Sequence, residues 1–231
     1  MSSTDAGYTG ADNLEVMREA FNYNAWLLRL IRRHAPSKGR VLDFGAGSGT
    51  FALPLQRAGL AMSCVEPDVA LGSMLRAEGL VCVPALEQLE EAAFDFAYTL
   101  NVLEHIDDDA AALTTLRTKL KPGSRLLVYV PAFQVLYGPM DRKVGHLRRY
   151  RRLDLVRCVR KAGFTVERSR YADSLGFFAA LAFRLLRREA TGELNPAHIR
   201  LYDRWAFPLS LVLDTIAWPF FGKNVIVVAR R

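Results

Sequence analysis

One ten-residue stretch, residues 41–50, constrains the fold more than any other part of the chain. Its sequence is VLDFGAGSGT, an apolar run that ends in an acid and is followed by a turn with three glycines. Between a buried strand and a helix, such a turn lets backbone N–H groups approach a ligand, because a side chain at the glycine positions would block the approach or strain the backbone. We therefore expect a nucleotide-like ligand at this turn.

The spacing of the glycines departs from that of dinucleotide-binding turns. Those turns follow the pattern G-x-G-x-x-G/A, whose third small residue would fall on Thr50, whereas the order here is G-x-G-x-G. Asp43 stands two residues before the first glycine, where it would repel a pyrophosphate but suit a ligand with a cationic end. S-adenosylmethionine has such an end, because it carries an ammonium and a sulfonium. Glu66, at the tip of the next expected strand, is placed to take the ribose hydroxyls.

These motifs resemble those of the class I S-adenosylmethionine-dependent methyltransferases, and the resemblance extends over most of the chain. Residues 43–49 match the family's acidic residue and G-x-G-x-G turn, and Glu66 matches its ribose acid. The segment NVLEHI, residues 101–106, is similar to the segment after the fourth strand, and LKPG, residues 120–123, to the turn before the fifth. The resemblance implies a doubly wound Rossmann-like sheet of seven strands, mostly parallel with the last strand antiparallel, and S-adenosylmethionine as cofactor.

The resemblance also implies which residues line the cofactor. Besides Asp43 for the methionine end and Glu66 for the ribose, the expected cofactor-binding residues are Gly45, Ala46, Gly47, Gly49, Pro67, Ala85, Leu86, Asn101, Val102 and Tyr23. Ala85 and Leu86 occupy the place where the family lines the adenine. Tyr23 belongs to a YNAW element, residues 23–26, which in one branch of the family lies on a helix over the cofactor; an amphipathic helix with an aromatic anchor in the core is an equal alternative.

Length and hydrophobic periodicity favour a single domain. A chain of 231 residues with 51% hydrophobic residues can bury a large core. Repeated β-α units predict a parallel sheet with helices on both faces. We expect an N-terminal helical segment over 13–40, with a break near Asn22, a Rossmann-like core over 41–171, a helical insertion over 172–223 and a last strand over 224–231. The fifth strand is expected over 124–130.

The insertion contains two apolar stretches, and neither is a clean span of about 20 apolar residues. Arg184 follows the first, and Asp214 and two prolines interrupt the second, so neither is predicted to cross a membrane. The many aromatic residues of the insertion predict a helical cap or a homodimer interface, with peripheral membrane contact as a further role. Burial against the monomer's own sheet is the alternative.

Charge and cysteine content limit the partners and the compartment. The net charge of +7 suggests an acidic partner such as phosphate, nucleic acid or an anionic membrane face, although excess charge also serves solubility. Three cysteines without a C-x-x-C pair support neither a disulfide framework nor a zinc site. The opening residues lack the pattern of a secretion signal. We expect a cytoplasmic protein, with contact at the membrane periphery left open.

The segment LYGPMDRKVGHLRRYRR, residues 136–152, is the most unusual part of the chain. It resembles the D-x-x-x-G-H-x-R-R-Y element of a methyltransferase branch grouped as type 11 or type 12, whose members are associated with glycan and polyprenyl-linked biosynthesis. Its guanidinium groups and aromatic rings suit an anionic acceptor. We predict acceptor binding by Tyr137, Arg148, Arg149 and Tyr150, with a solvated basic loop as the alternative.

Two histidines are the candidate general bases. Methyl transfer needs an acceptor lone pair held behind the methyl group, and a hydroxyl acceptor must also lose its proton. His105 follows the fourth strand and His146 lies on the loop after the fifth, so either can take this proton. Asp141 is the third predicted catalytic residue, although it could instead bind His146 structurally. We expect no metal site, because the acids at 107–109 are explained as helix N-terminal caps.

The absence of two sequence motifs narrows the classes of methyl acceptor. No Asn/Asp-Pro-Pro-aromatic sequence follows the fourth strand, as in amine-methylating nucleic-acid enzymes, and no Pro-Cys pair offers covalent attack on a pyrimidine. Hydroxyl, carboxyl or carbon acceptors on small molecules, lipids or glycans are left. Nucleic acid is a weaker candidate, because the basic loop could still follow a phosphate backbone. A nicotinamide-dependent dehydrogenase is disfavoured by Thr50 and Asp43, and a non-catalytic cofactor-binding subunit is left as an alternative.

Overall fold

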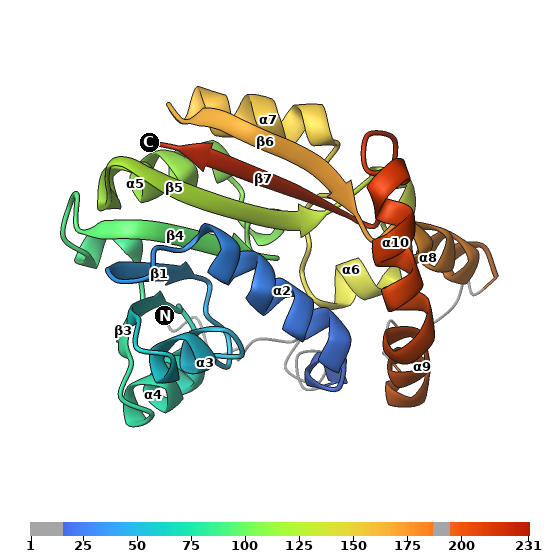
Figure 1. Cartoon of the computed structure of the whole chain (residues 1–231), viewed down its shortest axis with the longest axis horizontal. Helices are drawn as coiled ribbons and strands as arrows, with labels where there is room; N and C mark the ends of the chain where they lie inside the picture. The colour runs from blue at the N-terminus through green and yellow to red at the C-terminus, as the bar shows by residue number, and fades with distance from the viewer. Residues whose placement is uncertain (1–15, 187–194) are drawn as a thin grey trace, which may run out of the picture.

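A seven-stranded sheet runs through the centre of the protein (Figure 1). The computed structural model describes residues 16–186 and 195–231. The strand order is β3-β2-β1-β4-β5-β7-β6, and β7 is antiparallel to both of its neighbours while the other pairs are parallel. The strands are β1 Arg40–Phe44, β2 Ala61–Val65, β3 Val81–Val83, β4 Phe94–Leu100, β5 Leu120–Pro131, β6 Thr165–Ala172 and β7 Asn224–Arg230. The predicted fold class is confirmed.

Helices cover both faces of the sheet. They are α2 Phe21–His34, α3 Ala52–Arg57, α4 Val69–Ala77, α5 Asp109–Lys119 and α7 Arg152–Lys161. In Figure 1 α2 crosses in front of the sheet, whereas α5 and α7 lie behind it. The protein has two hydrophobic cores, one on each face of the sheet, and successive strand residues contribute to them alternately. Val41 packs in the core that contains Leu27 of α2, and Leu42 packs in the core that contains Leu113 of α5. The central strands β1, β4 and β7 are therefore buried on both faces, as expected of strands between two helical layers, whereas the edge strands β3 and β6 are partly exposed.

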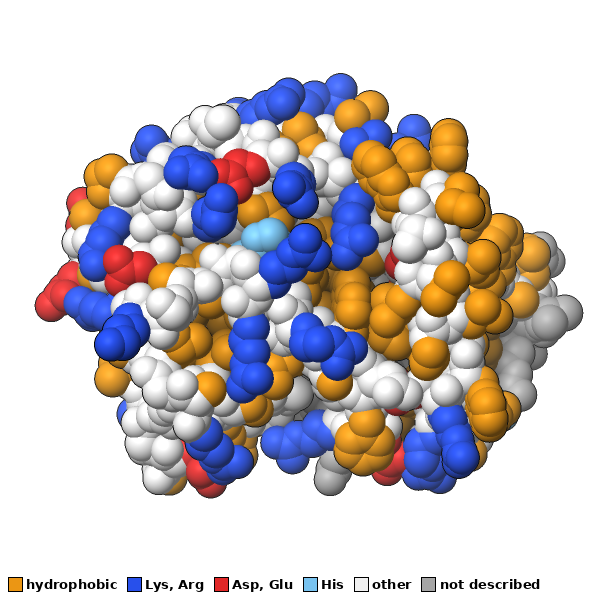
Figure 2. Space-filling view, viewed as in Figure 1, with side chains coloured by type: hydrophobic (Ala, Val, Ile, Leu, Met, Phe, Trp, Pro, Cys, Tyr) orange, Lys and Arg blue, Asp and Glu red, His pale blue; other side chains and the backbone are white. Residues whose placement is uncertain are grey.

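The insertion between β6 and β7 is helical, as predicted. It comprises α8 Ser174–Leu186, α9 Pro196–Leu201, a π-helical turn Tyr202–Ala206 and α10 Phe207–Ala217. These helices stand beside the carboxyl ends of β5 and β6 (Figure 1), and Figure 2 shows a hydrophobic band over this side of the molecule. Across the described ranges, no helix combines the length and the apolar character needed to cross a bilayer.

The N-terminal helical segment breaks at residues 19–20, close to the predicted break near Asn22, and α2 begins at Phe21. The first residues of the predicted segment, 13–15, lie outside the described residues. No side chain at the start of α2 caps it. The carboxylate of Asp203 does so instead, because it accepts the N–H groups of Asn22 and Tyr23 at 2.8 and 2.9 Å. The insertion thereby fixes the start of α2.

Two elements differ from the sequence prediction. β5 starts at Leu120, four residues before the expected 124, because residues 120–125 pair with β4 around a bulge. A short helix, α6 Pro139–Lys143, stands where an irregular path was predicted. Proline is favoured at a first helical position, and the Asp141 carboxylate accepts the N–H of Gly138 just before it, so both residues support this helix.

Candidate functional site

The glycine turn leaves the carboxyl end of β1 and opens on space that a ligand can occupy. Gly45 and Gly47 have φ angles of +86° and +52°, in the left-handed region that favours glycine. A Cβ added to Gly45 would lie 2.2 Å from Cγ2 of Val102, whereas a Cβ added to Gly47 would meet nothing within 4 Å. Gly45 is thus required by close packing against the segment after β4, and Gly47 faces open space.

Two buried carboxyl groups stand at this turn. Glu66 accepts hydrogen bonds from the N–H groups of Gly47 at 2.7 Å and Asp68 at 3.0 Å. Asp43 is 3% exposed and accepts a hydrogen bond from the Tyr98 hydroxyl at 2.7 Å. Burial raises the pKa of Asp43 to about 7, although the Tyr98 hydrogen bond opposes the rise, and burial also raises the pKa of Glu66. Two buried carboxyl groups with raised pKa values therefore lie at the carboxyl ends of β1 and β2.

The other residues predicted to line the cofactor follow the strands to the same edge, because parallel strands end together. Ala46 is buried in the turn, and Pro67 is exposed just after β2. Ala85 is half-buried after β3, whereas Leu86 points into the core and is 5% exposed. After β4, Asn101 is exposed and has a left-handed φ of +54°. The structure therefore gathers these residues around one edge, with Leu86 turned furthest inward.

Tyr23 reaches this edge from α2. Its hydroxyl lies 3.2 Å from that of Tyr129 and within hydrogen-bonding reach of the Asn101 side chain. Trp26, one turn further along α2, packs edge-on against Tyr129 and Phe207. The helix therefore anchors aromatic rings in the core and also brings Tyr23 beside Asn101, so the two alternatives drawn from the sequence are compatible.

A cluster of ionisable side chains begins two residues beyond Val102. Glu104 and His105 lie on the 3₁₀ turn after β4, and His146 lies just after α6. Nε2 of His146 is 3.8 Å from Oε1 of Glu104, and the rings of His105 and His146 are 4.7 Å apart, edge to face. The structure thus brings the two predicted bases together. Sequence reasoning missed Glu104, whose one signal was its place beside His105.

Asp141 and Arg149 hold His146 in position. Oδ1 of Asp141 is 2.7 Å from Nδ1 of His146 and also accepts a hydrogen bond from Nε of Arg149 at 2.8 Å. Burial alone would raise the pKa of Asp141, but the hydrogen bond with His146 and the charge of Arg149 lower it. An ionised Asp141 favours the proton on Nδ1 of His146, so Nε2 faces Glu104 as an acceptor.

Burial shifts the pKa values of Glu104 and His105 in opposite directions, each toward the uncharged form of the side chain. Burial raises the pKa of Glu104 to about 8, against the opposing influence of its own backbone N–H and the charge of Arg149. Burial and the neighbouring His146 lower the pKa of His105 to about 4, while a backbone hydrogen bond with Gly145 opposes the change. Both Glu104 carboxylate oxygens are buried and, among the described residues, neither has a hydrogen-bond partner.

Two of the predicted acceptor-binding residues point inward, which corrects that prediction. Tyr150 is 5% exposed, and its hydroxyl lies 2.6 Å from Oδ2 of Asp109 and 3.1 Å from the Leu103 carbonyl, so its ring is not available to stack on a sugar. The Arg149 side chain is also 5% exposed and is held by Asp141. The buried Asp141 and the partly buried Asp109 pair with side chains of this basic segment, which the charge run alone does not reveal.

The other two predicted residues lie nearer the surface. Arg148 is one-third exposed and contacts the Asp107 carbonyl and the Asp109 carboxylate, while the Tyr137 hydroxyl donates to the His146 carbonyl at 2.7 Å. Asp108 caps α5 as predicted, because it accepts the N–H of Ala111 at 2.8 Å. Asp109 instead faces Tyr150 and Arg148, so the acids at 107–109 do not act as a single group.

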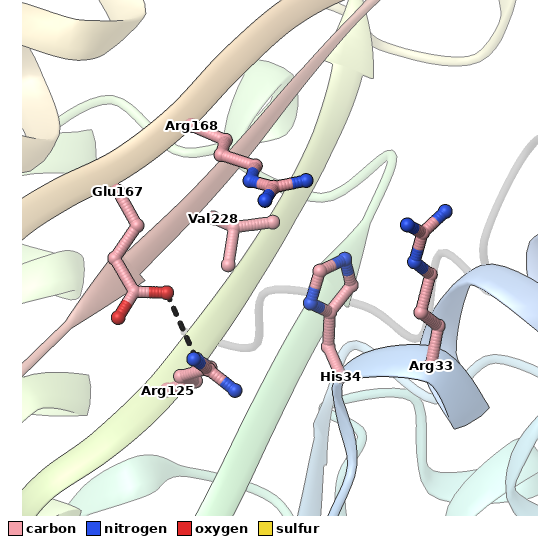
Figure 3. A pocket seen from close by; sticks show the side chains of 6 residues that line it. All are labelled: Arg33, His34, Arg125, Glu167, Arg168 and Val228. Carbon is pink, nitrogen blue, oxygen red and sulfur yellow. Dashed lines mark hydrogen bonds and ion pairs between the residues drawn. The ribbon is translucent and has the colours of Figure 1, made fainter.

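A hollow of about 390 Å³ lies at the opposite end of the sheet, near the start of β5 (Figure 3). Its lining residues are Arg33, His34, Arg125, Glu167, Arg168 and Val228. Arg125 and Glu167 are paired with each other at 2.8 Å. Because ligands of such sheets gather at the carboxyl ends of the strands, this hollow is separate from the predicted site.

Comparison with known proteins identifies the family. The methyltransferase domain model matches residues 16–169. A ubiquinone biosynthesis O-methyltransferase of Xylella fastidiosa is 33% identical over 112 residues, which is 44% of this chain and 46% of that protein. An uncharacterised methyltransferase of Mycobacterium leprae is 29% identical over 209 residues, 85% of this chain and 74% of that protein. The chain spans about half the length of the ubiquinone biosynthesis relatives that it matches.

Solved structures share the fold at low sequence identity. One matching chain comes from a complex between the Haloferax volcanii Trm112 methyltransferase activator and a protein described as a methyltransferase. It aligns over 99% of this chain and 99% of its own length, with a TM-score of 0.67 and 13% identity. An S-adenosylmethionine-dependent methyltransferase of Mesorhizobium loti aligns over 88% of this chain and 96% of that one, with a TM-score of 0.57 and 18% identity. The match of the methyltransferase domain model to residues 16–169, together with the glycine turn and the strand order, shows that the chain belongs to the class I S-adenosylmethionine-dependent methyltransferases.

Proposed function

We propose that the protein transfers the methyl group of S-adenosylmethionine to an oxygen atom of a small-molecule, lipid or glycan acceptor. The observation that carries this proposal is the cluster of Glu104, His105 and His146 beside the glycine turn, because a hydroxyl acceptor must lose its proton during the transfer. The O-methyltransferase name of the Xylella fastidiosa relative supports the same chemistry.

The cofactor site is proposed around the two acids of the turn. A carboxylate has about four lone-pair positions, so Glu66 can keep its bonds from Gly47 and Asp68 and still accept the ribose hydroxyls. Asp43 is placed to meet the ammonium of the methionine end. Tyr23 and Asn101 lie at the same edge, where they can contact the methionine part. Ala85 offers an apolar face to the adenine.

Proton removal is proposed at His146, with His105 as the alternative. Nε2 of His146 faces the interior of the cluster, and Asp141 behind it stabilises the imidazolium that would form on accepting a proton. Arg148 and Tyr137, at the rim of the cluster, are the residues placed to contact an anionic part of the acceptor. Arg149 acts through Asp141, so it is a positioning residue.

The helical insertion is proposed to contact a membrane that carries a lipid acceptor, and to act with the core as a single domain. The outer side of α10 exposes apolar side chains at helical spacing: Leu209, Val212, Leu213, Ile216, with Phe220 just beyond the helix. Exposed Arg200 and Arg204 precede α10 in the chain. An apolar face bordered by cations is typical of helices that lie on anionic bilayers. A second copy of the chain is the alternative occupant.

The proposal is tested by an assay with S-adenosylmethionine labelled in its methyl group and fractionated lipids, glycans, small molecules and RNA of the source cell. We expect label on oxygen in a lipid, glycan or small-molecule fraction. The variant His146→Ala should lower turnover by roughly 10²–10⁴-fold, whereas removal of the exposed His198 by His198→Ala should leave it unchanged. Label only in RNA, or only on nitrogen, would contradict the proposed acceptor class.

A further inference from the structure

We infer that Glu104, His105 and His146 bind a divalent transition-metal cation, which holds the acceptor oxygen during methyl transfer. The metal site follows from the geometry of the three side chains, whereas its part in catalysis rests on the proposed transfer to oxygen. The inference departs from the expectation of no metal site, which considered the acids at 107–109 and left Glu104 out.

The three side chains offer a suitable ligand set at nearly the right spacing. One ligand atom from each lies within 4.8 Å of the others, and Nε2 of His146 is 3.8 Å from Oε1 of Glu104. Metal bonds to imidazole and carboxylate are about 2.0–2.2 Å long, so two ligands of one ion stand roughly 3–4 Å apart. The separation of 3.8 Å already lies in this range, and the limit of 4.8 Å exceeds it by less than about 1 Å, so metal binding at this site requires a side-chain shift of at most that size.

The carboxyl group of Glu104 lacks the partners that a buried polar group normally has, which points to a bound cation. This carboxyl group is fully buried, and among the described residues neither of its oxygens forms a hydrogen bond with another residue. Buried polar groups are nearly always paired, since an unpaired one is costly. The separation of 3.8 Å from His146 is too long for a hydrogen bond. A cation between the two groups would satisfy the carboxylate and account for the separation.

The surroundings of the histidines are those of metal ligands. Metal-binding histidines commonly donate their other ring N–H to a carboxylate or a backbone carbonyl, which fixes the ring and its tautomer. His146 has this arrangement, because its Nδ1 lies 2.7 Å from the Asp141 carboxylate, which Arg149 and the N–H of Gly138 hold in turn. His105 forms a hydrogen bond with the backbone of Gly145.

Three protein ligands leave positions on the cation for the acceptor. A hydroxyl bound there loses its proton more readily, because the cation stabilises the oxyanion. The oxygen then forms a bond to the methyl carbon while the bond from that carbon to sulfur breaks, so the sulfonium becomes a neutral thioether. The proton passes to water. In this state His146 is a ligand, and no side chain of the cluster needs to act as the base.

Metal binding is measured without acceptor or cofactor, on chelator-stripped protein that carries no histidine tag. Calorimetry with Zn²⁺ and visible spectra with Co²⁺ should each report one site per chain. Glu104→Gln, a neutral side chain of the same shape, and His146→Ala should each weaken binding by at least roughly 100-fold. His198→Ala is the matched control and should bind as the wild type does. Asp141→Asn should weaken binding by about 10–100-fold, the effect expected of a positioning residue.

The inference is overturned if the folded wild type binds no Zn²⁺, or if folded Glu104→Gln binds it as tightly as the wild type. Should Glu104→Gln fail to fold by circular dichroism, His105→Ala takes its place. The methyl-transfer assay separates this failure from that of the proposed function. Equal methyl-transfer rates in metal-free and metal-loaded protein would show that the metal plays no part in catalysis, and His146 would again be the proposed general base. A site that binds metal in a protein that methylates no oxygen would instead overturn the proposed function.

Discussion

Asp43 is a buried acid of the proposed cofactor site, and its protonation is coupled to folding. Its pKa is raised by burial from 3.8 to about 7. Below pH 3.8 the carboxyl is protonated in both the folded and the unfolded chain, so burial costs nothing there. Between pH 3.8 and 7 the unfolded chain ionises and the folded one does not, so this residue's contribution to stability falls as pH rises and levels off above 7.

Asp43→Asn should remove this pH dependence. We expect the cofactor-free variant to match the wild type near pH 4 and to be more stable by roughly 2–4 kcal/mol at pH 8, because each unit of pKa shift corresponds to about 1.4 kcal/mol. Thermal unfolding in steps from pH 4 to 8 measures the difference. A constant difference at every pH would show that the ionisation of Asp43 is not coupled to folding.

Arg149 supports the cluster through geometry as well as charge. Its Nε donates to Asp141 at 2.8 Å and another nitrogen lies 3.3 Å from the Ala132 carbonyl, a fork that a lysine cannot reproduce. Arg149→Lys should therefore lower methyl-transfer turnover by about 10–100-fold, as loss of an outer partner does at metal sites, while S-adenosylmethionine binding is kept. The exposed Arg151, changed to Lys, is the matched control. Equal turnover in both variants would remove Arg149 from the site.

For single residues, the sequence predicts the part of the fold in which a residue lies better than it predicts where its side chain points. The positions of Asp43 and Glu66 follow from their places at the carboxyl ends of β1 and β2, and that of His146 from its place on the segment after β5, which leaves the sheet at the same edge. Tyr150 was predicted to face the acceptor, but it turns inward, where its hydroxyl donates to the partly buried Asp109 carboxylate. Glu104 was not singled out, because its burial depends on residues 40 positions away in the chain, such as Leu147, whose N–H bonds its carbonyl.

At the level of helices and strands, two helices are capped by acids from distant parts of the chain, which local sequence patterns do not predict. The Asp203 carboxylate, from the insertion, caps the start of α2, and Asp214 caps α8 by accepting the N–H groups of Asp173 and Ser174 at 2.7 and 2.9 Å. In the sequence Asp214 only interrupts an apolar stretch. Both acids are buried, at 5% and 4% exposed, so each serves an internal bond.

Asp203→Ala tests the long-range cap. The change removes two hydrogen bonds from the start of α2 and should cost about 1–2 kcal/mol of stability. Each kcal/mol corresponds to roughly 2–4 °C in melting temperature for a chain of this size. We also expect weaker cofactor binding, because Tyr23 lies on this turn. The exposed Asp154 on α7, changed to Ala, should alter neither quantity. A melting temperature unchanged by Asp203→Ala would show that α2 does not depend on this cap.

The strand bounds follow closely from apolar runs, except where a distant partner extends a strand. β5 begins four residues early partly because the end of the chain pairs beside it: Gly123 donates to the Arg231 carbonyl, and Arg231 donates to Ser124. Lys121, Pro122 and Gly123 are typical turn residues, so their local preference predicts a turn. The missed helix α6 has the same cause, because its cap involves Asp141, whose second oxygen is fixed by His146 and Arg149.

For the whole molecule, the apolar side of α10 is the surface that we propose to contact a membrane. Ile216 is 77% exposed and Phe220 is 73% exposed, so acidic substitutions there should not disturb the core. We expect the wild type to bind anionic vesicles, and the double variant Ile216→Asp, Phe220→Asp to bind at least roughly tenfold more weakly. Leu153→Asp is the control, since Leu153 is 62% exposed on α7.

Light scattering gives the alternative outcome for this surface. A dimer that dissociates in the double variant, in a protein that does not bind vesicles, would assign the surface to a second copy of the chain. A monomer that ignores vesicles would mean that neither partner uses it.

The most direct test of the account is calorimetry of S-adenosylmethionine with the wild type and with Glu66→Ala. We predict one cofactor per wild-type chain and a loss of about 1–3 kcal/mol in Glu66→Ala, the cost of losing hydrogen bonds to a charged group, which is roughly 5–150-fold in affinity. Glu167→Ala, in the hollow at the other end of the sheet, should bind as the wild type does. Unchanged affinity in folded Glu66→Ala, or weakened affinity in Glu167→Ala alone, would contradict a cofactor site at the glycine turn.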